Sequence, residues 1–126
     1  MLFFGLKFRI LKLFSYLFQV AHNNRHFDSI ILTTNLLKLD LDLPENVIMA
    51  DSFDLTNHKS HETSYMKLKL ALKSWCNTDQ KEPHTALEDA KYVKMVTKAG
   101  AKRLGYDSYS AYLDQNWNDS TFKMIL

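Results

Sequence analysis

The sequence predicts an α/β fold in which short apolar strands alternate with amphipathic helices. Two apolar runs, at residues 18–21 and 47–50, are too short for helices and are bounded by polar or turn-forming residues. Longer segments with apolar residues at helical spacing precede, separate and follow them. The order helix, strand, helix, strand, helix, helix is typical of parallel strands covered by helices. Because two parallel strands alone make a marginal sheet, strands that complete the sheet are expected to be missing.

The composition is that of one small globular domain. The chain has 126 residues, of which 46% are hydrophobic and 24% charged, so residues 1–126 are expected to form a single domain. The formal charge of +2 is too small to indicate a nucleic-acid-binding protein by bulk charge. The single cysteine, Cys76, excludes an intramolecular disulfide. Together with the lack of a clear signal peptide, this predicts an intracellular protein, cytoplasmic or nuclear.

The divergent N-terminal segment, residues 1–17, is predicted to contain an amphipathic helix at residues 6–17. Basic residues interrupt the segment, so no apolar run reaches the roughly 20 residues that a membrane span needs. The helix is expected to belong to the core, and contact with a membrane surface is the alternative. The apolar residues at helical spacing are Leu6, Ile10, Leu13, Phe14 and Leu17.

The remaining elements follow from turn signals and periodicity. A buried strand at 18–21 is broken by three polar residues and followed by a helix at 27–39. After Pro44 and Asn46 comes a second strand, at 47–50. The later predicted helices are at 64–75, 85–104 and 107–117, the last within a helical tail at 105–126. Thr85 and Glu88 have the spacing of a capping box at the start of the 85–104 helix.

Two carboxylates stand in similar places on the predicted helices. Asp89 shares a face of its helix with Val93 and Val96, whereas the lysines of that helix lie on the opposite, solvated face. Asp28 stands in the first turn of the 27–39 helix, on a face with Ile31, Leu32, Asn35 and Leu39. A buried carboxylate needs a hydrogen-bond partner, a cation or a metal ion. The alternative is that both acids only complement the helix dipole.

Two motifs resemble those of a known enzyme family. Residues 20–28, Val-Ala-His-Asn-Asn-Arg-His-Phe-Asp, resemble the second motif of DEDDh-type 3′→5′ exonucleases, a strand ending in His-Asn and followed by Phe-Asp or Tyr-Asp. The extra residue between these pairs is similar to the three-prime repair exonuclease branch. Residues 84–90, His-Thr-Ala-Leu-Glu-Asp-Ala, resemble the third motif, His-x-Ala-x-x-Asp. Residues 48–55 resemble the strand and Asp-Ser/Thr-Leu segment between these motifs.

The resemblance implies a fold and a chemistry. The fold would be ribonuclease-H-like, with residues 18–104 carrying the second and third motifs. Asp28 and Asp89 would bind Mg²⁺ or Mn²⁺ in a two-metal site, and His84 would be the catalytic base that takes the proton of the attacking water. The substrate would be the 3′ end of DNA or RNA, which Arg25 and Asn23 would contact. Homodimers are common in the family, so a homodimer is a further expectation.

The sequence departs from the family at the first motif, Asp-x-Glu, which lies on the opening strand of a three-stranded antiparallel section. Only 19 residues precede Val20, and none of them is Asp or Glu. A partial domain is therefore predicted, without the opening antiparallel strands, which binds metal weakly and cleaves poorly or not at all. The alternatives are a non-catalytic nucleic-acid-binding or scaffold remnant of the fold, and a truncated product without independent function.

Other polar and aromatic features have simpler explanations. His58, His61 and Glu62 are predicted to belong to a solvated loop rather than to a metal site. Trp75 and Trp117 are expected to be packing residues rather than surfaces for base stacking. The lysines of the 85–104 helix are expected to be a solvated face, with a track for nucleic-acid phosphates as the alternative.

Overall fold

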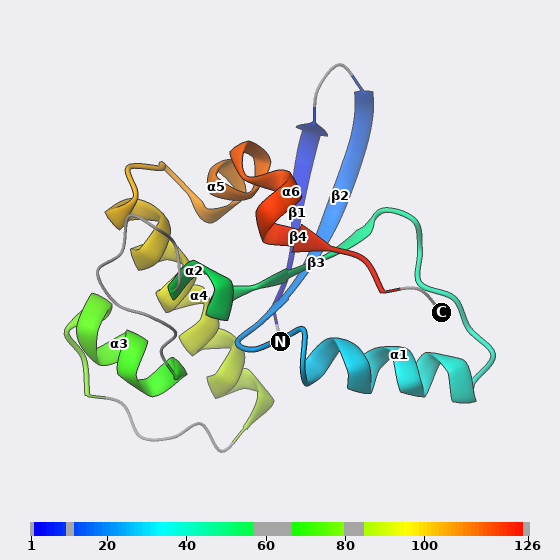
Figure 1. The fold of residues 1–126 in the computed structure, drawn as a ribbon, viewed down its shortest axis with the longest axis horizontal. Coiled ribbons are helices and arrows are strands. Elements are labelled where there is room, and N and C mark those ends of the chain that lie inside the picture. The colour runs from blue at the N-terminus through cyan, green and yellow to red at the C-terminus, as the bar shows by residue number, and fades with distance from the viewer. Residues whose placement is uncertain (1, 10–11, 57–66, 80–84, 125–126) are drawn as a thin grey trace.

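The computed structural model describes residues 2–9, 12–56, 67–79 and 85–124, which are arranged around a four-stranded sheet (Figure 1). The strand order is β1-β2-β3-β4. β1 (Leu2–Arg9) pairs antiparallel with β2 (Lys12–Ala21), and β2 pairs parallel with β3 (Val47–Asp51). β3 pairs antiparallel with β4 (Thr121–Phe122). The mixed sheet confirms the α/β class and contains both predicted strands.

The helices of the described chain lie between the strands in sequence, with one before β3 and the others between β3 and β4. They are α1 (Asp28–Lys38), α2 (Ser52–Thr56), α3 (Leu68–Cys76), α4 (Ala86–Arg103), α5 (Tyr109–Gln115) and α6 (Trp117–Ser120). α1, α3, α4 and α5 confirm the four helices predicted after residue 26, with shifted ends. α2 and β4 were not predicted, because elements of five and two residues are too short to show a periodicity. No helix in this part of the chain is long and apolar enough to cross a membrane.

The prediction of an N-terminal helix at residues 6–17 is wrong, because residues 6–9 belong to β1 and residues 12–17 to β2. In the hairpin, Leu2 is paired with Val20 and Leu6 with Tyr16. The segment from Phe4 to Arg9 alternates large apolar residues with glycine or basic residues, which suits a strand as well as a helix. The antiparallel pairings of β1 and β4 also correct the prediction of an incomplete sheet without antiparallel strands. The Asp-x-Glu motif is absent from the sequence all the same.

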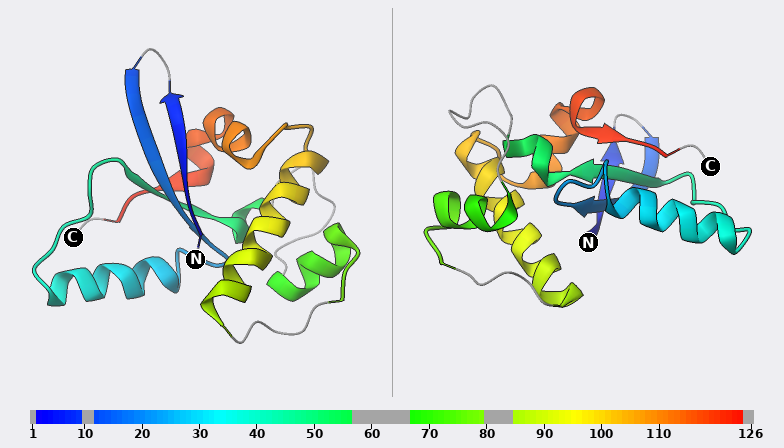
Figure 2. Two further views of the ribbon diagram at one scale, coloured as in Figure 1. Left: turned by 180° about the vertical axis from the view of Figure 1, so that it is seen from behind. Right: turned by 60° about the horizontal axis from the view of Figure 1, so that its bottom comes forward.

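The main core packs the sheet against α2, α4 and α5 (Figure 2). Phe18, in β2, is fully buried, and its ring lies 5.1 Å from that of Phe4 and 5.7 Å from that of Trp117. Trp117 and Trp75 both pack against this core, which confirms their predicted packing role. The rings of Phe18 and its two neighbours therefore join β1, β2 and α6.

α4 approaches α2 and α3 closely at Gly100. A Cβ atom at this position would lie 2.5 Å from Leu55 Cδ2 and 2.8 Å from Trp75 Cζ3, which is closer than nonbonded carbon atoms approach. The absence of a side chain therefore lets α4 lie against α2, the helix that directly follows β3. This packing fixes α4 relative to the end of the parallel strand pair.

The outward face of α1 differs from the prediction. Asp28 was expected to share a buried face with residues that include Ile31, Asn35 and Leu39, but these three side chains are exposed. The buried side chains of α1 are Ser29 and Thr33. Because the Ser29 hydroxyl donates a 2.6 Å hydrogen bond to the Asn24 carbonyl, the polar side of the helix faces the preceding loop. The apolar side is therefore turned toward solvent.

Candidate functional site

The loop at residues 22–27 joins β2 to α1, and Asn24 organises it. The Asn24 side chain is fully buried. Its Nδ2 atom donates hydrogen bonds to the Gln19 carbonyl at 3.2 Å, to Gln19 Oε1 at 2.7 Å and to the Ala50 carbonyl at 2.8 Å. These acceptors belong to both parallel strands, so Asn24 connects the carboxyl ends of β2 and β3.

His22, two residues before Asn24, contacts the start of α2. His22 Nδ1 lies 2.8 Å from Ser52 Oγ, and the His22 ring meets the Phe53 ring edge-on at 5.1 Å. Asn23 has a φ of 60°, a left-handed conformation that asparagine tolerates better than most residues. The Asn23 Oδ1 atom is buried and has no hydrogen-bond partner in the described part of the chain. Contact of Asn23 with nucleic acid stays a prediction.

Asp51, the last residue of β3, accepts hydrogen bonds from backbone N–H groups of the protein. Only 2% of the residue is exposed. Its Oδ1 accepts a 2.9 Å hydrogen bond from the Phe53 N–H, and its Oδ2 accepts a 3.1 Å hydrogen bond from the Arg25 N–H. The carboxylate therefore connects the start of α2 to the loop that precedes α1. We did not predict Asp51 as a site residue, although it lies in the segment that resembles the exonuclease family.

Arg25 is held by groups within the protein. Its guanidinium forms an ion pair with Asp54 and lies 4.4 Å from the centre of the Phe122 ring. Burial and the charge of Asp51 raise the pKa of Asp54, and the guanidinium of Arg25 opposes the increase. Because Phe122 belongs to β4, the C-terminal strand holds a residue of the second-motif loop in place. The predicted contact of Arg25 with nucleic acid stays a prediction.

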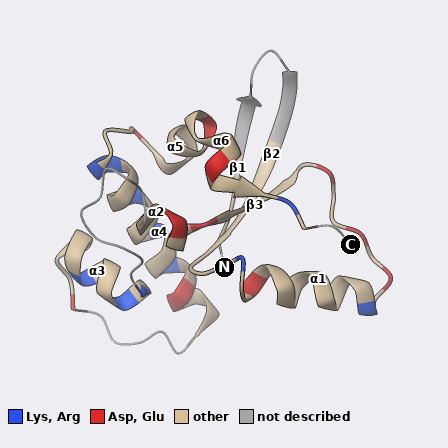
Figure 3. Cartoon of the chain, in the orientation of Figure 1, with Lys and Arg blue, Asp and Glu red and all other residues tan. Residues whose placement is uncertain are grey.

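Asp28 and Asp89, the acids of the two motifs, interact electrostatically. Asp28 is the first residue of α1, and Asp89 lies in the first turn of α4 (Figure 3). Burial is the main cause of the raised pKa of Asp28, and the negative charges of Asp89 and Asp51 raise it further. The charges of Asp51, in β3, and of Asp89, in α4, thus both act on Asp28. Asp28 follows the carboxyl end of β2, and Asp51 is the last residue of β3.

No protein-family model matches the chain, and neither a curated protein nor a solved structure matches it. The function must therefore be argued from the motifs and from the geometry of the three acids.

The acids supply only part of a metal site. Within the ranges that the structure describes, no three His, Cys, Asp or Glu side chains are grouped closely enough to hold a metal ion. Asp51 accepts a backbone hydrogen bond at each oxygen, and Asp28 and Asp89 remain the candidate ligands that the motifs predict. His84, the predicted catalytic base, lies outside the described residues. The same is true of His58, His61 and Glu62.

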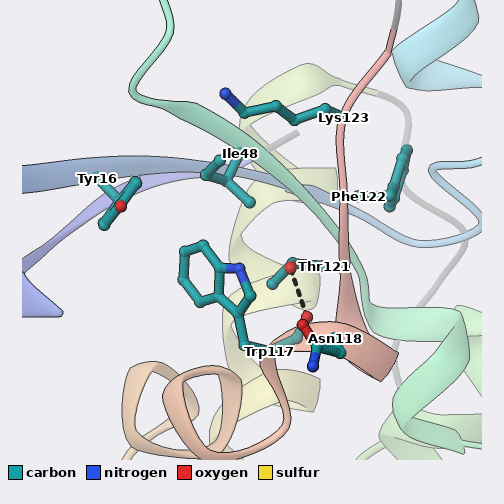
Figure 4. Close-up of a pocket in the computed structure, with 7 residues that line it drawn as sticks. All are labelled: Tyr16, Ile48, Trp117, Asn118, Thr121, Phe122 and Lys123. Atoms are coloured by element: carbon teal, nitrogen blue, oxygen red, sulfur yellow. Dashed lines mark hydrogen bonds between the residues drawn. The ribbon is translucent and has the colours of Figure 1, made fainter. Parts of the chain in front are cut away.

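A pocket of about 380 Å³ lies elsewhere, along β4 (Figure 4). Its lining residues are Tyr16, Ile48, Trp117, Asn118, Thr121, Phe122 and Lys123. The rings of Tyr16 and Trp117 are in contact at a centroid distance of 5.0 Å, and Lys123 Nζ donates a 2.7 Å hydrogen bond to the Glu45 carbonyl. Because no acid is among the lining residues, the pocket is not a candidate for the metal chemistry of the motifs.

Replacing Asp28 by asparagine is expected to stabilise the metal-free protein. A raised pKa means that the folded state binds the proton more tightly than the unfolded chain. The free energy of unfolding therefore falls as the pH rises from the ordinary value of 3.8 through the raised pKa. Because the side chain is partly exposed and screened by solvent, the expected gain is about 0.5 kcal/mol at pH 7 and low salt.

Urea unfolding with EDTA, at pH 7 and again at pH 3, would measure this difference. The gain should disappear at pH 3, where the carboxyl group is protonated in both states. Asp42→Asn is the matched control, since Asp42 is exposed, and it should change the stability little at either pH. A destabilised Asp28→Asn protein at pH 7 would show that the carboxylate has a structural role at the helix start.

Proposed function

We propose that this chain carries the second and third motifs of a DEDDh-type 3′→5′ exonuclease, in a ribonuclease-H-like fold. Asp28 and Asp89 are the metal-binding carboxylates, and His84 is the general base. The substrate is the 3′ end of a DNA or RNA strand. The observation that carries the proposal is the pair of motifs at residues 20–28 and 84–90. The negative charge of Asp89, which acts on Asp28, supports it, as does the position of Asp28 after the carboxyl end of β2, because open α/β sheets bind ligands at such ends.

The electrostatics of the three acids favour binding of a cation. Burial and, to a smaller extent, the negative charges of Asp89 and Asp51 raise the pKa of Asp28, and the positive N-terminal amino group opposes the increase. A divalent cation near Asp28 would be attracted by the same negative charges. Mg²⁺ and Mn²⁺ prefer oxygen ligands, and Mg²⁺ is commonly held by one or two carboxylates together with water and substrate phosphates. When bound, such an ion neutralises phosphate charge and promotes ionisation of water. The two motif acids are sufficient for binding of this kind, at low affinity.

The protein's own residues would prepare the rest of the site. Asp51 and Asn24 hold the loop from β2 to α1 against β3, which fixes the position of Asp28 at the start of the helix. His84 directly precedes Thr85, the N-cap of α4, whose side chain accepts a 3.1 Å hydrogen bond from the Glu88 N–H. An imidazole ordinarily titrates near neutral pH, so it is suited to accept a proton from an attacking water molecule.

Activity of this chain alone is expected to be low, because the sequence lacks the Asp-x-Glu acids. In the family these acids are the main ligands that hold the two metal ions together. Two carboxylates supply less negative charge to hold two divalent cations. A second candidate function, favoured by this absence, is a nucleic-acid-binding or scaffold protein that keeps the fold without catalysis.

A thermal-shift experiment with Mn²⁺ and a nucleoside monophosphate would test the site. A ligand that binds only the folded state at tenfold its Kd stabilises the protein by about 1.4 kcal/mol, which raises the Tm by about 5 °C in a protein of this size. We expect this increase for the wild-type chain, and we expect Asp28→Asn and Asp89→Asn each to abolish most of it. Asp42→Asn should leave it unchanged. An increase that survives both motif substitutions would refute the site.

Release of nucleotides from 5′-labelled DNA and RNA oligonucleotides would test catalysis separately. We expect weak release or none with Mg²⁺ or Mn²⁺. Robust release that is lost on Asp89→Asn would show that the chain is a complete enzyme, against our proposal of an impaired one. Oligonucleotide binding without release would favour the non-catalytic alternative.

A further inference from the structure

The pocket along β4 opens onto the face of the sheet that carries the main core. Phe18, in β2, is paired with Ile48, in β3, and both side chains belong to the core, so they lie on the same face of the sheet. Tyr16 lies two residues before Phe18 and therefore points to this face as well. Trp117, in α6, covers Phe18, and the pocket of about 380 Å³ remains beside it (Figure 4). The pocket thus has an apolar floor and aromatic walls.

Polar side chains stand at the rim of this pocket. Figure 4 shows Lys123, directly after β4, on the pocket side, whereas the Phe122 side chain points to the other side, where its ring contacts Arg25. The exposed amide of Asn118 and the hydroxyl of Tyr16 are further polar groups of the lining. Sites for small molecules combine a mainly apolar and aromatic lining with a few polar groups that fix the orientation of the ligand. The pocket has both features.

The charge of the pocket favours an anionic ligand. Among the described residues that line it, Lys123 is basic and none is acidic. Lys123 Nζ donates a 2.7 Å hydrogen bond to the backbone carbonyl of Glu45, which positions the ammonium group but does not neutralise its charge. A lysine ammonium has three N–H donors, so it can also donate to a ligand. The side chain of Glu45 is exposed and is not part of the lining.

We propose that this pocket binds a small aromatic carboxylate. The ring of the ligand lies against Trp117 and Tyr16, and its carboxylate accepts hydrogen bonds from the Lys123 ammonium and the Asn118 amide. The rings of Tyr16 and Trp117 are inclined to each other by 61°, so a third ring can stack on one of them and meet the other edge-on, the two arrangements that aromatic rings prefer. The volume is near the lower end for ligand sites, which suits one ring or two fused rings.

A phosphate group is a less suitable partner for the same pocket. A phosphate monoester carries a charge of about −1.5 to −2 at pH 7, and proteins usually bind it with arginine or with several backbone N–H groups at a helix N-terminus. The lining contributes one lysine and no arginine, and α6 has only four residues. A carboxylate, with a single negative charge, matches the single charge of Lys123.

An NMR titration with 2-naphthoate, in EDTA so that no metal ion binds, would locate the ligand. The chain has two tryptophans, so the indole N–H signal of Trp75, in α3, is an internal control for that of Trp117. We expect the Trp117 signal to shift with a Kd on the order of 1 mM, as is usual for a ligand with few atoms, and the Trp75 signal to stay in place. Shifts of equal size for both signals, shifts confined to α1, or no saturable shift would refute the proposal.

Charge variants would test the role of Lys123. At low salt, Lys123→Gln should weaken binding of 2-naphthoate about fivefold, which corresponds to the roughly 1 kcal/mol of an exposed ion pair, and leave binding of the neutral 2-naphthamide unchanged. Lys102→Gln, at an exposed position of α4, is the matched control and should change neither affinity. Glu45→Gln should tighten binding of 2-naphthoate, because it removes a negative charge near the Lys123 ammonium.

A Lys123→Gln protein that keeps the wild-type ratio of the two affinities would refute the assignment of the carboxylate to Lys123. Equal Tm values of wild type and variant would show that the substitution leaves the fold intact. Asp28→Asn, which alters the proposed metal site, should leave the affinity for 2-naphthoate unchanged. The result is therefore independent of metal binding and of nuclease activity.

Discussion

Replacing Asn24 by aspartate is expected to lower the free energy of unfolding by about 4 kcal/mol at pH 7, the magnitude of an unpaired buried charge. The two side chains have nearly the same shape, but a carboxylate cannot donate hydrogen bonds. It would face three oxygen acceptors, on Gln19 and Ala50, that now accept from Asn24 Nδ2. The residue is fully buried, so water cannot replace the lost donors.

The destabilisation should decrease as the pH falls. A carboxyl group surrounded by acceptors has a raised pKa, since the protonated form can donate one hydrogen bond and carries no charge. The folded variant therefore binds a proton more tightly than the unfolded one, and acidification restores part of its stability. Urea unfolding at pH 7 and pH 5 would measure this, with exposed Asn35→Asp as the control. A loss below about 1 kcal/mol at pH 7 would contradict the hydrogen-bond arrangement at the strand ends.

Replacing Phe18 by alanine is expected to cost about 4 kcal/mol of stability, within the range for a large side chain removed from a packed core. Phe18 is fully buried and contacts the rings of Phe4 and Trp117. The substitution would leave a cavity between β1, β2 and α6 that these rigid rings cannot fill. Chemical denaturation would measure the loss. Phe3→Ala is the control, because Phe3 is 46% exposed, and it should cost less than about 1.5 kcal/mol.

The same experiment distinguishes the hairpin from the predicted N-terminal helix when Phe4→Ala is added. Phe4 stacks on Phe18 and lies 6.0 Å from the Tyr109 ring, so its removal should destabilise the protein by about 2 kcal/mol. Equal, small effects of Phe3→Ala and Phe4→Ala would contradict the strand, in which neighbouring side chains point to opposite faces.

Local signals in the sequence predicted much of the fold after residue 17. The predicted N-cap at Thr85 is confirmed, because its side chain accepts a hydrogen bond from the Glu88 N–H. On α4, Val93, Val96 and Gly100 are buried and the lysines are exposed, as the helical periodicity required. β3 was identified as a short, wholly apolar run, and all five of its residues are buried. In each case the information lies within a few residues of the element.

Features that depend on distant partners were missed or assigned wrongly. The apolar residues of the N-terminal segment are compatible with the periodicity of a helix and with that of a strand. The segment forms a strand because it pairs with β2. α1 was expected to bury its apolar side, but its buried side chains are Ser29 and Thr33, and the Ser29 hydroxyl donates a hydrogen bond to the Asn24 carbonyl of the preceding loop. Within the site, Asn24 and Asp51 form hydrogen bonds that connect the ends of two strands with the adjoining loops. The spacing of residues in the sequence does not predict such contacts, and only the resemblance indicated the segment around Asp51.

The effect of burial and of the charges of Asp51 and Asp89 on Asp28 has an evolutionary consequence. An acid that destabilises the folded protein when nothing is bound is under continuous pressure for replacement, because its loss raises stability. Asp28 is in this position, unlike Asp51, whose backbone hydrogen bonds give it a structural use. In a lineage that no longer uses the site, we expect Asp28 to be replaced earlier than Asp51. The order in which these acids disappear among descendants of this chain would thus record whether selection still acts on metal binding.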